Sequence, residues 1–194
     1  MKLIFATNNR NKIEEIKSAV PQSLEIITLM EAGIDVDIPE PHQTLEENAA
    51  EKSGVIHKLT KQNCFSEDTG LQVGALNGSP GVRSARYAGD EANAERNTAL
   101  LLKNMKTITH RGAQFKTVIS LIYGEKEFHF TGICKGKISI AEAGTNGFGY
   151  DSVFVPDGDE RTFAEMTLEE KNKYSHRKKA LVKLIDFLNN LDSQ

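Results

Sequence analysis

The chain has 194 residues, with 24 Lys and Arg against 27 Asp and Glu, so its formal net charge is −3. About 70% of the extended-chain surface can be buried at this mass, and 39% hydrophobic with 26% charged residues is ordinary for a soluble globular protein. The slight acidity disfavours a binder of nucleic-acid polymers, which carries a basic excess. No apolar run approaches the roughly 18 residues of a membrane span, so we expect a cytoplasmic protein with no membrane partner.

In the first part of the chain, short apolar runs that predict strands alternate with stretches whose apolar residues have helical spacing. Residues 3–6 predict a short strand, and the amphipathic stretch over 13–20 predicts a helix directly after it. Residues 24–29 predict a second strand. A second helix is expected to begin at Thr44, because Thr44 and Glu47 have the spacing of a capping box.

The remaining elements follow from the same apolar patterns. They are a strand at 71–76, a loop at 77–89, a helix at 90–105, a β-hairpin over 115–123 and 128–140 that turns at 124–126, a strand at 153–155 and an amphipathic helix over 180–188. Early alternation of strands and helices followed by a late hairpin predicts an α/β fold with a mixed central sheet flanked by helices. No linker divides the chain, so we expect a single domain over residues 1–194 with two lobes.

A polar cluster at the first strand-to-helix turn is a candidate phosphate site. It consists of Thr7, Asn8, Asn9, Arg10, Asn11 and Lys12. A helix N-terminus presents unpaired N–H groups and the positive end of the helix dipole, which suits a phosphate. The cluster is not a Walker loop, because it lacks the required glycines. A solvated turn with Asn11 as the N-cap explains the local sequence equally well.

Neighbouring carboxylates after the apolar pair at 64–65 are a candidate metal site. Glu67 and Asp68 offer the oxygen ligands that Mg²⁺ prefers. Neighbouring residues on a strand point to opposite faces, so we expect one of the two to face the site. Solvated loop acids are the alternative. Glu47 on the second helix is a further candidate, although the capping box explains it without a ligand and Glu46 lies beside it.

Two further segments carry candidate ligand-binding side chains. In the segment of Phe148, Gly149, Tyr150 and Asp151, glycines flank an aromatic residue, which lets a ring stand clear for stacking on a base. A tight turn with its rings in the core is the alternative. Ser175 is a plausible N-cap for the last helix, which would place His176 and Arg177 in its first turn. Cations there oppose the helix dipole, a cost that a bound anion or polar ligand could offset. A solvated basic turn is the simpler alternative.

Six motifs occur in an order that resembles the inosine triphosphate pyrophosphatase family. They are Thr-Asn-Asn-x-x-Lys at 7–12, Thr-Leu-Glu-Glu-Asn-Ala at 44–49, Glu-Asp-Thr-Gly-Leu at 67–71, Leu-Asn-Gly-x-Pro-Gly-Val-x-Ser-Ala-Arg-Tyr-Ala-Gly at 76–89, Gly-Phe-Gly-Tyr-Asp at 147–151 and Ser-His-Arg at 175–177. The resemblance covers nearly the whole chain.

The resemblance implies an elongated two-lobed α/β fold with the site in the cleft between the lobes, and a homodimer. It also implies Mg²⁺-dependent hydrolysis of ITP, dITP and XTP to the monophosphate and pyrophosphate. By motif, the triphosphate would contact the cluster from Thr7 to Lys12 together with Lys52, and Thr69 would also contact the nucleotide. Mg²⁺ would bind Glu47 and Asp68, with Asp68 as the proton acceptor. The base would contact Phe148, Gly149, Tyr150, Asp151, Lys171, His176 and Arg177.

Two other functions fit parts of the pattern. A Maf-like nucleotide pyrophosphatase would prefer pyrimidine or modified nucleotides, and the motifs at 147–151 and 175–177 fit the purine family better. A non-catalytic nucleotide-binding module would sense a nucleotide without hydrolysing it. The joint presence of Lys12, Glu47, Lys52 and Asp68 disfavours that module.

Overall fold

The computed structural model describes residues 1–191, in which seven strands and five α-helices form a mixed α/β fold. The strands are β1 (Lys2–Phe5), β2 (Glu25–Thr28), β3 (Cys64–Val73), β4 (Pro80–Gly81), β5 (Gly112–Tyr123), β6 (Lys126–Ile138) and β7 (Phe154–Pro156). The helices are α1 (Arg10–Lys17), α2 (Leu45–Thr60), α3 (Ala94–Asn104), α4 (Leu168–Asn172) and α5 (His176–Leu191).

The strands lie in one sheet in the order β2-β1-β3-β5-β6-β7, with β4 paired to β3. β1 pairs in parallel with both β2 and β3, for example Leu3 with Ile26 and Phe5 with Phe65. β4 is antiparallel to β3, and β7 is antiparallel to β6. The mixed central sheet predicted from the sequence is therefore confirmed.

The chain divides into two compact units. The first contains Met1–Asp68, Thr117–Gly132 and the chain from Arg177 onward, and the second contains Thr69–Lys116 and Ile133–His176. Strands β3, β5 and β6 contribute residues to both units. The single domain over residues 1–194 and the cleft between lobes stay predictions, and residues 192–194 lie outside the described part of the chain.

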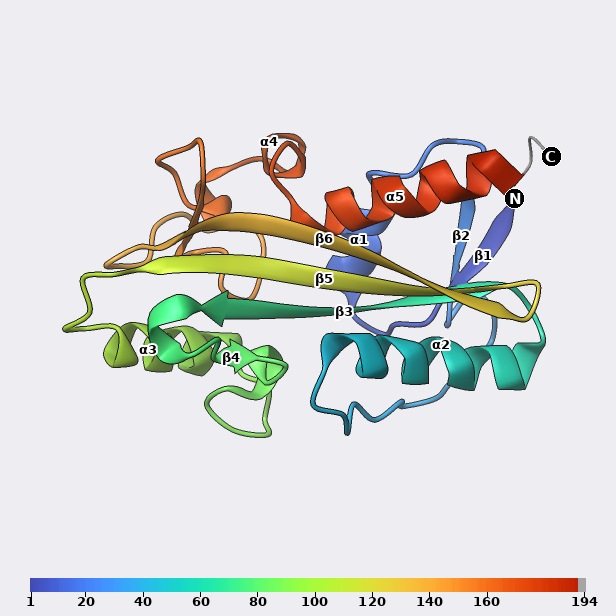
Figure 1. Cartoon of the computed structure of the whole chain (residues 1–194), viewed down its shortest axis with the longest axis horizontal. Helices are drawn as coiled ribbons and strands as arrows, with labels where there is room; N and C mark the ends of the chain where they lie inside the picture. The colour runs from blue at the N-terminus through green and yellow to red at the C-terminus, as the bar shows by residue number, and fades with distance from the viewer. Residues whose placement is uncertain (192–194) are drawn as a thin grey trace. The chain divides into compact units, whose positions relative to one another are not determined.

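Period-two alternation explains how the first unit is packed. In β1, Leu3 and Phe5 join one hydrophobic cluster with α1 and α5, while Ile4 joins a second cluster with Ile56 of α2. In β3, Phe65 and Cys64 divide between the same two clusters, because successive strand residues point to opposite faces. α1 and α5 therefore cover one face of this part of the sheet and α2 covers the other (Figure 1).

The second unit has its own aromatic core. Phe154 packs edge-on against Phe115 with ring centroids 4.7 Å apart, and it also packs against Phe163 at 5.1 Å. Leu101 and Met105, on and just after α3, are fully buried in the same cluster. Aromatic pairs in these geometries contribute about 0.5–1.5 kcal/mol each beyond their buried area.

Most predicted elements are confirmed, with changes in extent; the helix predicted over 13–20, for example, is α1, Arg10–Lys17. β3 is continuous over Cys64–Val73, so the strand predicted at 71–76 begins earlier and ends at a short 3₁₀ helix, Gly74–Leu76. The acidic residues do not interrupt it because they are buried beside cations. The helix predicted at 90–105 begins at Ala94, since Asn93 caps it through the N–H of Arg96.

The predicted hairpin turn is also confirmed. Gly124 and Glu125 connect β5 to β6, and both have positive φ, 54° and 66°. Positive φ at both central residues defines the type I′ turn, whose twist matches that of the flanking strands. The short helix α4 has no counterpart among the predicted elements; five residues are too few for an apolar period.

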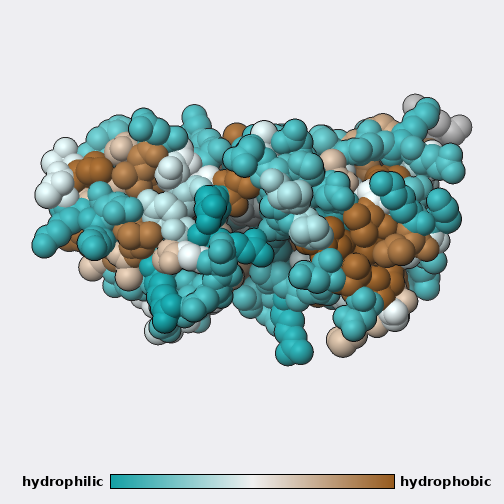
Figure 2. All heavy atoms as spheres, turned by 90° about the horizontal axis from the view of Figure 1, so that it is seen from below, coloured by the Kyte–Doolittle hydropathy of each residue, from teal (hydrophilic) through white to brown (hydrophobic). Residues whose placement is uncertain are grey.

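The surface is mainly hydrophilic on the face drawn in Figure 2, with separate hydrophobic areas. This agrees with the mean hydropathy of −0.41. Over residues 1–191, no helix is both long and apolar enough to cross a membrane.

Candidate functional site

The candidate site residues fall into two clusters, one in each unit. Asp68 is the last residue of a segment of the first unit, and Thr69 is the first residue of a segment of the second. Similarly, His176 belongs to the second unit and Arg177 to the first. Lys12, Lys52, Asp68 and Arg177 therefore belong to the first cluster, with their charged partners. The second cluster contains Thr69, which is half-buried, and the residues predicted to contact a base.

Asp68 is the central residue of the first cluster. Its side chain is buried on β3, and Oδ1 lies 3.2 Å from the Lys52 ammonium. Oδ2 is also buried, and it has no hydrogen-bond partner among the described residues. Burial raises the pKa of Asp68, an effect that the charge of Lys52 only partly offsets. Such a carboxylate is suited to accept a proton or to bind a cation.

Glu40 is the second carboxylate of this cluster. Its Oε1 atom accepts a short hydrogen bond from the Lys52 ammonium, so Glu40 and Asp68 share one cation. Burial alone would lower the pKa of Lys52, but the charges of Asp68 and Glu40 raise it. Lys52 is therefore charged at neutral pH. No pattern in the sequence pointed to Glu40, which lies between Pro39 and Pro41 in a stretch without helix or strand.

Glu47 lies in the first turn of α2 and forms only half of the predicted capping box, because its carboxylate accepts from the Thr44 hydroxyl and not from the Thr44 N–H. Thr44 is the N-cap of α2, and its hydroxyl accepts from the Glu47 N–H at 3.2 Å. The Thr44 hydroxyl also donates to Glu47 Oε2 at 2.7 Å. Glu47 is exposed, whereas Glu40 lies beside Asp68. A metal role for Glu47 stays a prediction, and the geometry favours Glu40.

A buried ion network connects α1, β3 and α5. Arg177 donates from Nε and Nη2 to the two oxygens of Glu67, at 3.0 and 3.2 Å, and from Nη1 to Glu15. The Lys12 ammonium lies 2.8 Å from Glu67 Oε1. Burial would raise the pKa of Glu67, but the charges of Arg177 and Lys12 outweigh it and lower that pKa. Glu67 is therefore ionised at neutral pH.

The polar turn before α1 has a different cap from the one considered from the sequence. Asn9 is the N-cap, and its side chain accepts from the Lys12 N–H at 3.2 Å, whereas Asn11 lies within the helix and is exposed. Asn8 donates to the carbonyl of Val36 at 3.0 Å. Asn11 is not the cap because α1 already begins at Arg10.

The second cluster surrounds the turn at 147–151. Tyr150 belongs to the core, and its hydroxyl donates to the carbonyl of Ser84 at 2.8 Å, while Phe148 is only half-buried. Tyr150 therefore packs in the core, as the tight-turn alternative expects, while stacking of the half-buried Phe148 on a base stays a prediction. Asp151 Oδ2 accepts from the Phe148 N–H at 2.9 Å, which holds the turn closed.

Two basic side chains of the second cluster, Lys171 and His176, are also buried. The Lys171 ammonium lies 2.5 Å from Asp151 Oδ2 and 5.2 Å from the centroid of the Phe148 ring. The His176 ring stacks on Phe115, with centroids 4.6 Å apart and 15° between the planes. Buried donors placed beside an aromatic surface are suited to recognise a planar, polar ligand such as a nucleobase.

Gly147 makes the turn possible. Its φ is +75°, and a Cβ atom there would overlap the Asp151 carboxylate, whereas a Cβ on Gly149 would meet nothing within 4 Å. Gly149 has a similar φ of +64°. Gly147→Ala is therefore expected to destabilise the protein more than Gly149→Ala, which pays only the backbone cost of about 1–2 kcal/mol. Urea unfolding of the two variants measures this, and equal losses would contradict it.

Three comparisons describe proteins to which the chain is similar. The model of the Ham1 family matches residues 3–187. A curated dITP/XTP pyrophosphatase from Flavobacterium johnsoniae is 50% identical over 188 residues, covering 97% of this chain and 98% of that protein. One from Flavobacterium psychrophilum is 49% identical over 190 residues, covering 98% and 100%. The solved structure of the Staphylococcus aureus Ham1 protein matches with a TM-score of 0.88 at 37% identity, covering 98% and 99% of the two chains.

Proposed function

Because this chain belongs to the Ham1 family, we propose that it is a pyrophosphatase acting on the non-standard purine nucleotides ITP, dITP and XTP. It converts the triphosphate to the monophosphate and pyrophosphate, which keeps deaminated purines out of DNA and RNA. The observation that carries this proposal is the Asp68 carboxylate, which is buried, shares Lys52 with Glu40 and has an oxygen without a hydrogen-bond partner among the described residues.

Asp68 acts as the proton acceptor in the proposed reaction. A water oxygen bonds to the α-phosphorus, the bond from this phosphorus to the oxygen bridging it to the β-phosphorus breaks, and pyrophosphate leaves with the electron pair. Asp68 takes the proton of the attacking water. An ordinary aspartate, with a pKa of about 3.9, is a weak base at neutral pH, and the raised pKa of Asp68 makes it a better one.

The cations of the first cluster hold the triphosphate. Lys12 and Lys52 each carry three N–H donors, so Lys12 can bind a phosphate oxygen in addition to Glu67, and Lys52 in addition to Glu40 and Asp68. The first N–H groups of α1 provide further donors, and the polar residues from Thr7 to Asn11 lie at this helix end. Such donors, fixed before the reaction, stabilise the charge that develops in phosphoryl transfer.

Asp68 and Glu40 are the residues that would hold Mg²⁺. Their fit to a divalent cation rests on the paired carboxylates and on the buried Asp68 Oδ2 atom that lacks a hydrogen-bond partner within the described chain. No group of three or more His, Cys, Asp or Glu side chains within residues 1–191 is arranged for a metal, as expected for Mg²⁺, which keeps several waters and binds substrate phosphates. When bound, Mg²⁺ neutralises phosphate oxygens.

Lys171 and His176 are the proposed donors to the base, with Phe148 as the aromatic surface. ITP and XTP carry an oxygen at purine C6, where ATP carries an amino group, so a donor facing C6 pairs with the first two and is left unpaired by ATP. A buried unpaired donor costs about 1–3 kcal/mol, or roughly 5–150-fold in selectivity. Arg177 fits this role less well, because Nε, Nη1 and Nη2 all donate to carboxylates of the first unit.

A nucleotide panel tests the proposal. The protein is incubated with Mg²⁺ and ITP, dITP, XTP, ATP, GTP or UTP, and pyrophosphate and phosphate are assayed separately. We expect pyrophosphate from ITP, dITP and XTP at rates well above that from ATP. A preference for pyrimidine nucleotides would favour the Maf-like alternative, and nucleotide binding without hydrolysis would favour a sensing module.

We also propose that the protein works in the cytoplasm, and that it is a homodimer, as the family resemblance implies. Light scattering coupled to gel filtration measures this state, with a mass near twice 21.4 kDa expected.

A further inference from the structure

Glu40 lies in a part of the chain that has no regular secondary structure of its own. Residues 34–41 connect the turn after β2 to α2 and form neither helix nor strand. Ile34, Val36 and Ile38 are partly buried against the hydrophobic cluster under α2, which anchors the first part of the segment. Ile38 is the last residue of this segment in that cluster, and the Glu40 carboxylate itself makes a polar contact, with the Lys52 ammonium.

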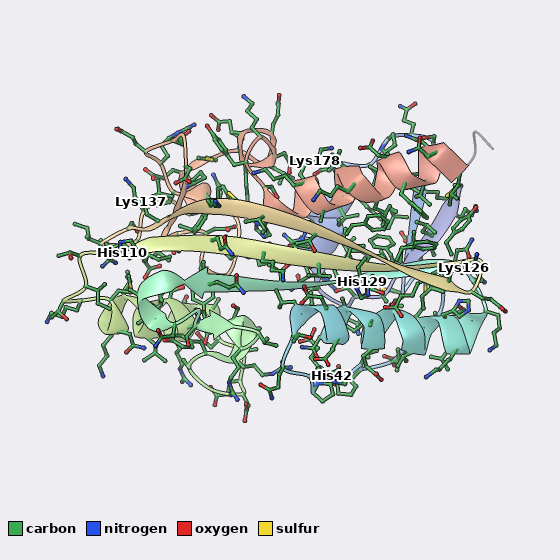
Figure 3. The ribbon with its side chains drawn as sticks, viewed as in Figure 1. His42, His110, Lys126, His129, Lys137 and Lys178 are labelled. Carbon is green, nitrogen blue, oxygen red and sulfur yellow. The ribbon has the colours of Figure 1, made fainter. Side chains whose placement is uncertain are left out.

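Asn48 supplies those contacts. Its side chain is fully buried on the first turn of α2, and Oδ1 accepts from the His42 N–H at 2.9 Å. Its Nδ2 donates to the His42 carbonyl at 3.3 Å. The carboxamide thus pairs with both backbone groups of His42, two residues after Glu40; Figure 3 shows His42 beside α2.

Lys52, on the same face of α2 as Asn48, makes a second contact with this segment by binding the Glu40 carboxylate. Lys52 follows Asn48 by four residues, which places the two side chains one turn apart on the helix, and Lys52 binds both Glu40 and Asp68. Lys52 is a flexible side chain that can follow a displaced carboxylate. Asn48 attaches the segment more rigidly, because its planar carboxamide carries both the acceptor and the donor that bind the His42 backbone.

We propose that Asn48 is a positioning residue that sets the Glu40 carboxylate against Asp68 for divalent-cation binding. The inference rests on the proposed function, since it concerns the same metal site. Asn48 contacts neither carboxylate in this role; it acts by holding the backbone of residues 40–42 against α2. Without it the His42 N–H and carbonyl, which are part-buried, lose these partners, and we expect the segment to move away from β3.

The test measures Mn²⁺ binding to the free protein by electron paramagnetic resonance, so that no turnover is involved. Asn48→Ala is expected to weaken Mn²⁺ binding by about 10–100-fold, the range found for residues that orient metal ligands. Amide hydrogen exchange at His42 should accelerate in the same variant. In the nucleotide assay, the rate should recover at high Mg²⁺ concentration, which a purely structural defect would not produce.

Asn97 provides the matched control. It is nearly fully buried in the second unit, where its side chain accepts from the Ala88 N–H at 2.7 Å and donates to the Ala85 carbonyl at 2.8 Å. Asn97→Ala removes the same kind of two-point attachment, so it should cost similar stability and leave Mn²⁺ affinity unchanged. If Asn48→Ala does not fold, Asn48→Asp replaces it in the test. Asn48→Asp keeps the acceptor for the His42 N–H and loses the donor, so an intermediate loss of Mn²⁺ affinity is expected.

The outcomes separate the inference from the proposed function. A wild-type protein that binds Mn²⁺ and releases pyrophosphate, together with a folded Asn48 variant of unchanged Mn²⁺ affinity, would overturn the positioning role alone. Equal losses of affinity in the Asn48 and Asn97 variants would also overturn it. A wild-type protein that binds no divalent cation would overturn both proposals.

Discussion

The Asp68→Asn variant is expected to release pyrophosphate at least about 10³-fold more slowly than the wild type, because it loses both the proton acceptor and a cation ligand. An amide cannot take the proton of the attacking water at neutral pH. Its oxygen can still accept from Lys52, which lies 3.2 Å from Asp68 Oδ1. Steady-state assays with ITP and saturating Mg²⁺ measure the loss.

The fold of this variant should remain intact. Asn has the shape of Asp, and burial disfavours the ionised form of Asp68, whose pKa is raised for that reason. Urea midpoints close to that of the wild type are therefore expected. Asp90→Asn is the control for a simple change of charge, since the Asp90 side chain is 93% exposed. A folded Asp68→Asn protein with a rate near that of the wild type would remove Asp68 from the catalytic role.

Arg177→Met is expected to lower the free energy of unfolding at pH 7 by about 3–5 kcal/mol, the cost of removing one partner from a buried ion pair. Arg177 is 3% exposed and binds Glu67 and Glu15, so its loss leaves two buried carboxylates with less compensation. Chemical denaturation measures the change. Arg161→Met, at a side chain 44% exposed that pairs with Asp159 and Glu170, should change stability little.

The stability lost in Arg177→Met should become smaller as the pH falls. The pKa of Glu67 in the folded protein lies below its ordinary value of 4.5, so the stabilisation it brings is fully present above about pH 4.5 and is lost as the pH falls toward the folded-state pKa. In Arg177→Met, Glu67 is no longer held ionised in this way and can protonate as the pH falls. The difference in free energy of unfolding between Arg177→Met and the wild type should therefore become smaller below pH 4.5. A difference that stays constant down to pH 3 would contradict the role of the ion network.

Local sequence features were enough to predict much of the fold. Thr44 and Glu47 lie three residues apart, and the predicted start of α2 with Thr44 as its N-cap is confirmed, although the reciprocal bond of a capping box does not form. The turn at Gly124 and Glu125 and the apolar period of α5 are equally local. The family resemblance is also confirmed, because it depended on ordered motifs rather than on contacts.

The candidate site was predicted less completely, since its partners are distant in sequence. Glu40 precedes Lys52 by 12 residues and Asp68 by 28, in a stretch without periodicity, and Glu15 and Arg177 are 162 residues apart. The sequence by itself determined which elements form and which family motifs are present, because both are written in neighbouring residues. Only the tertiary structure decided that Glu40 rather than Glu47 lies beside Asp68, and that Arg177 binds Glu67 and Glu15. The fold brings these charges together from separate elements, and each buried charge needs an opposite partner because losing its water is costly.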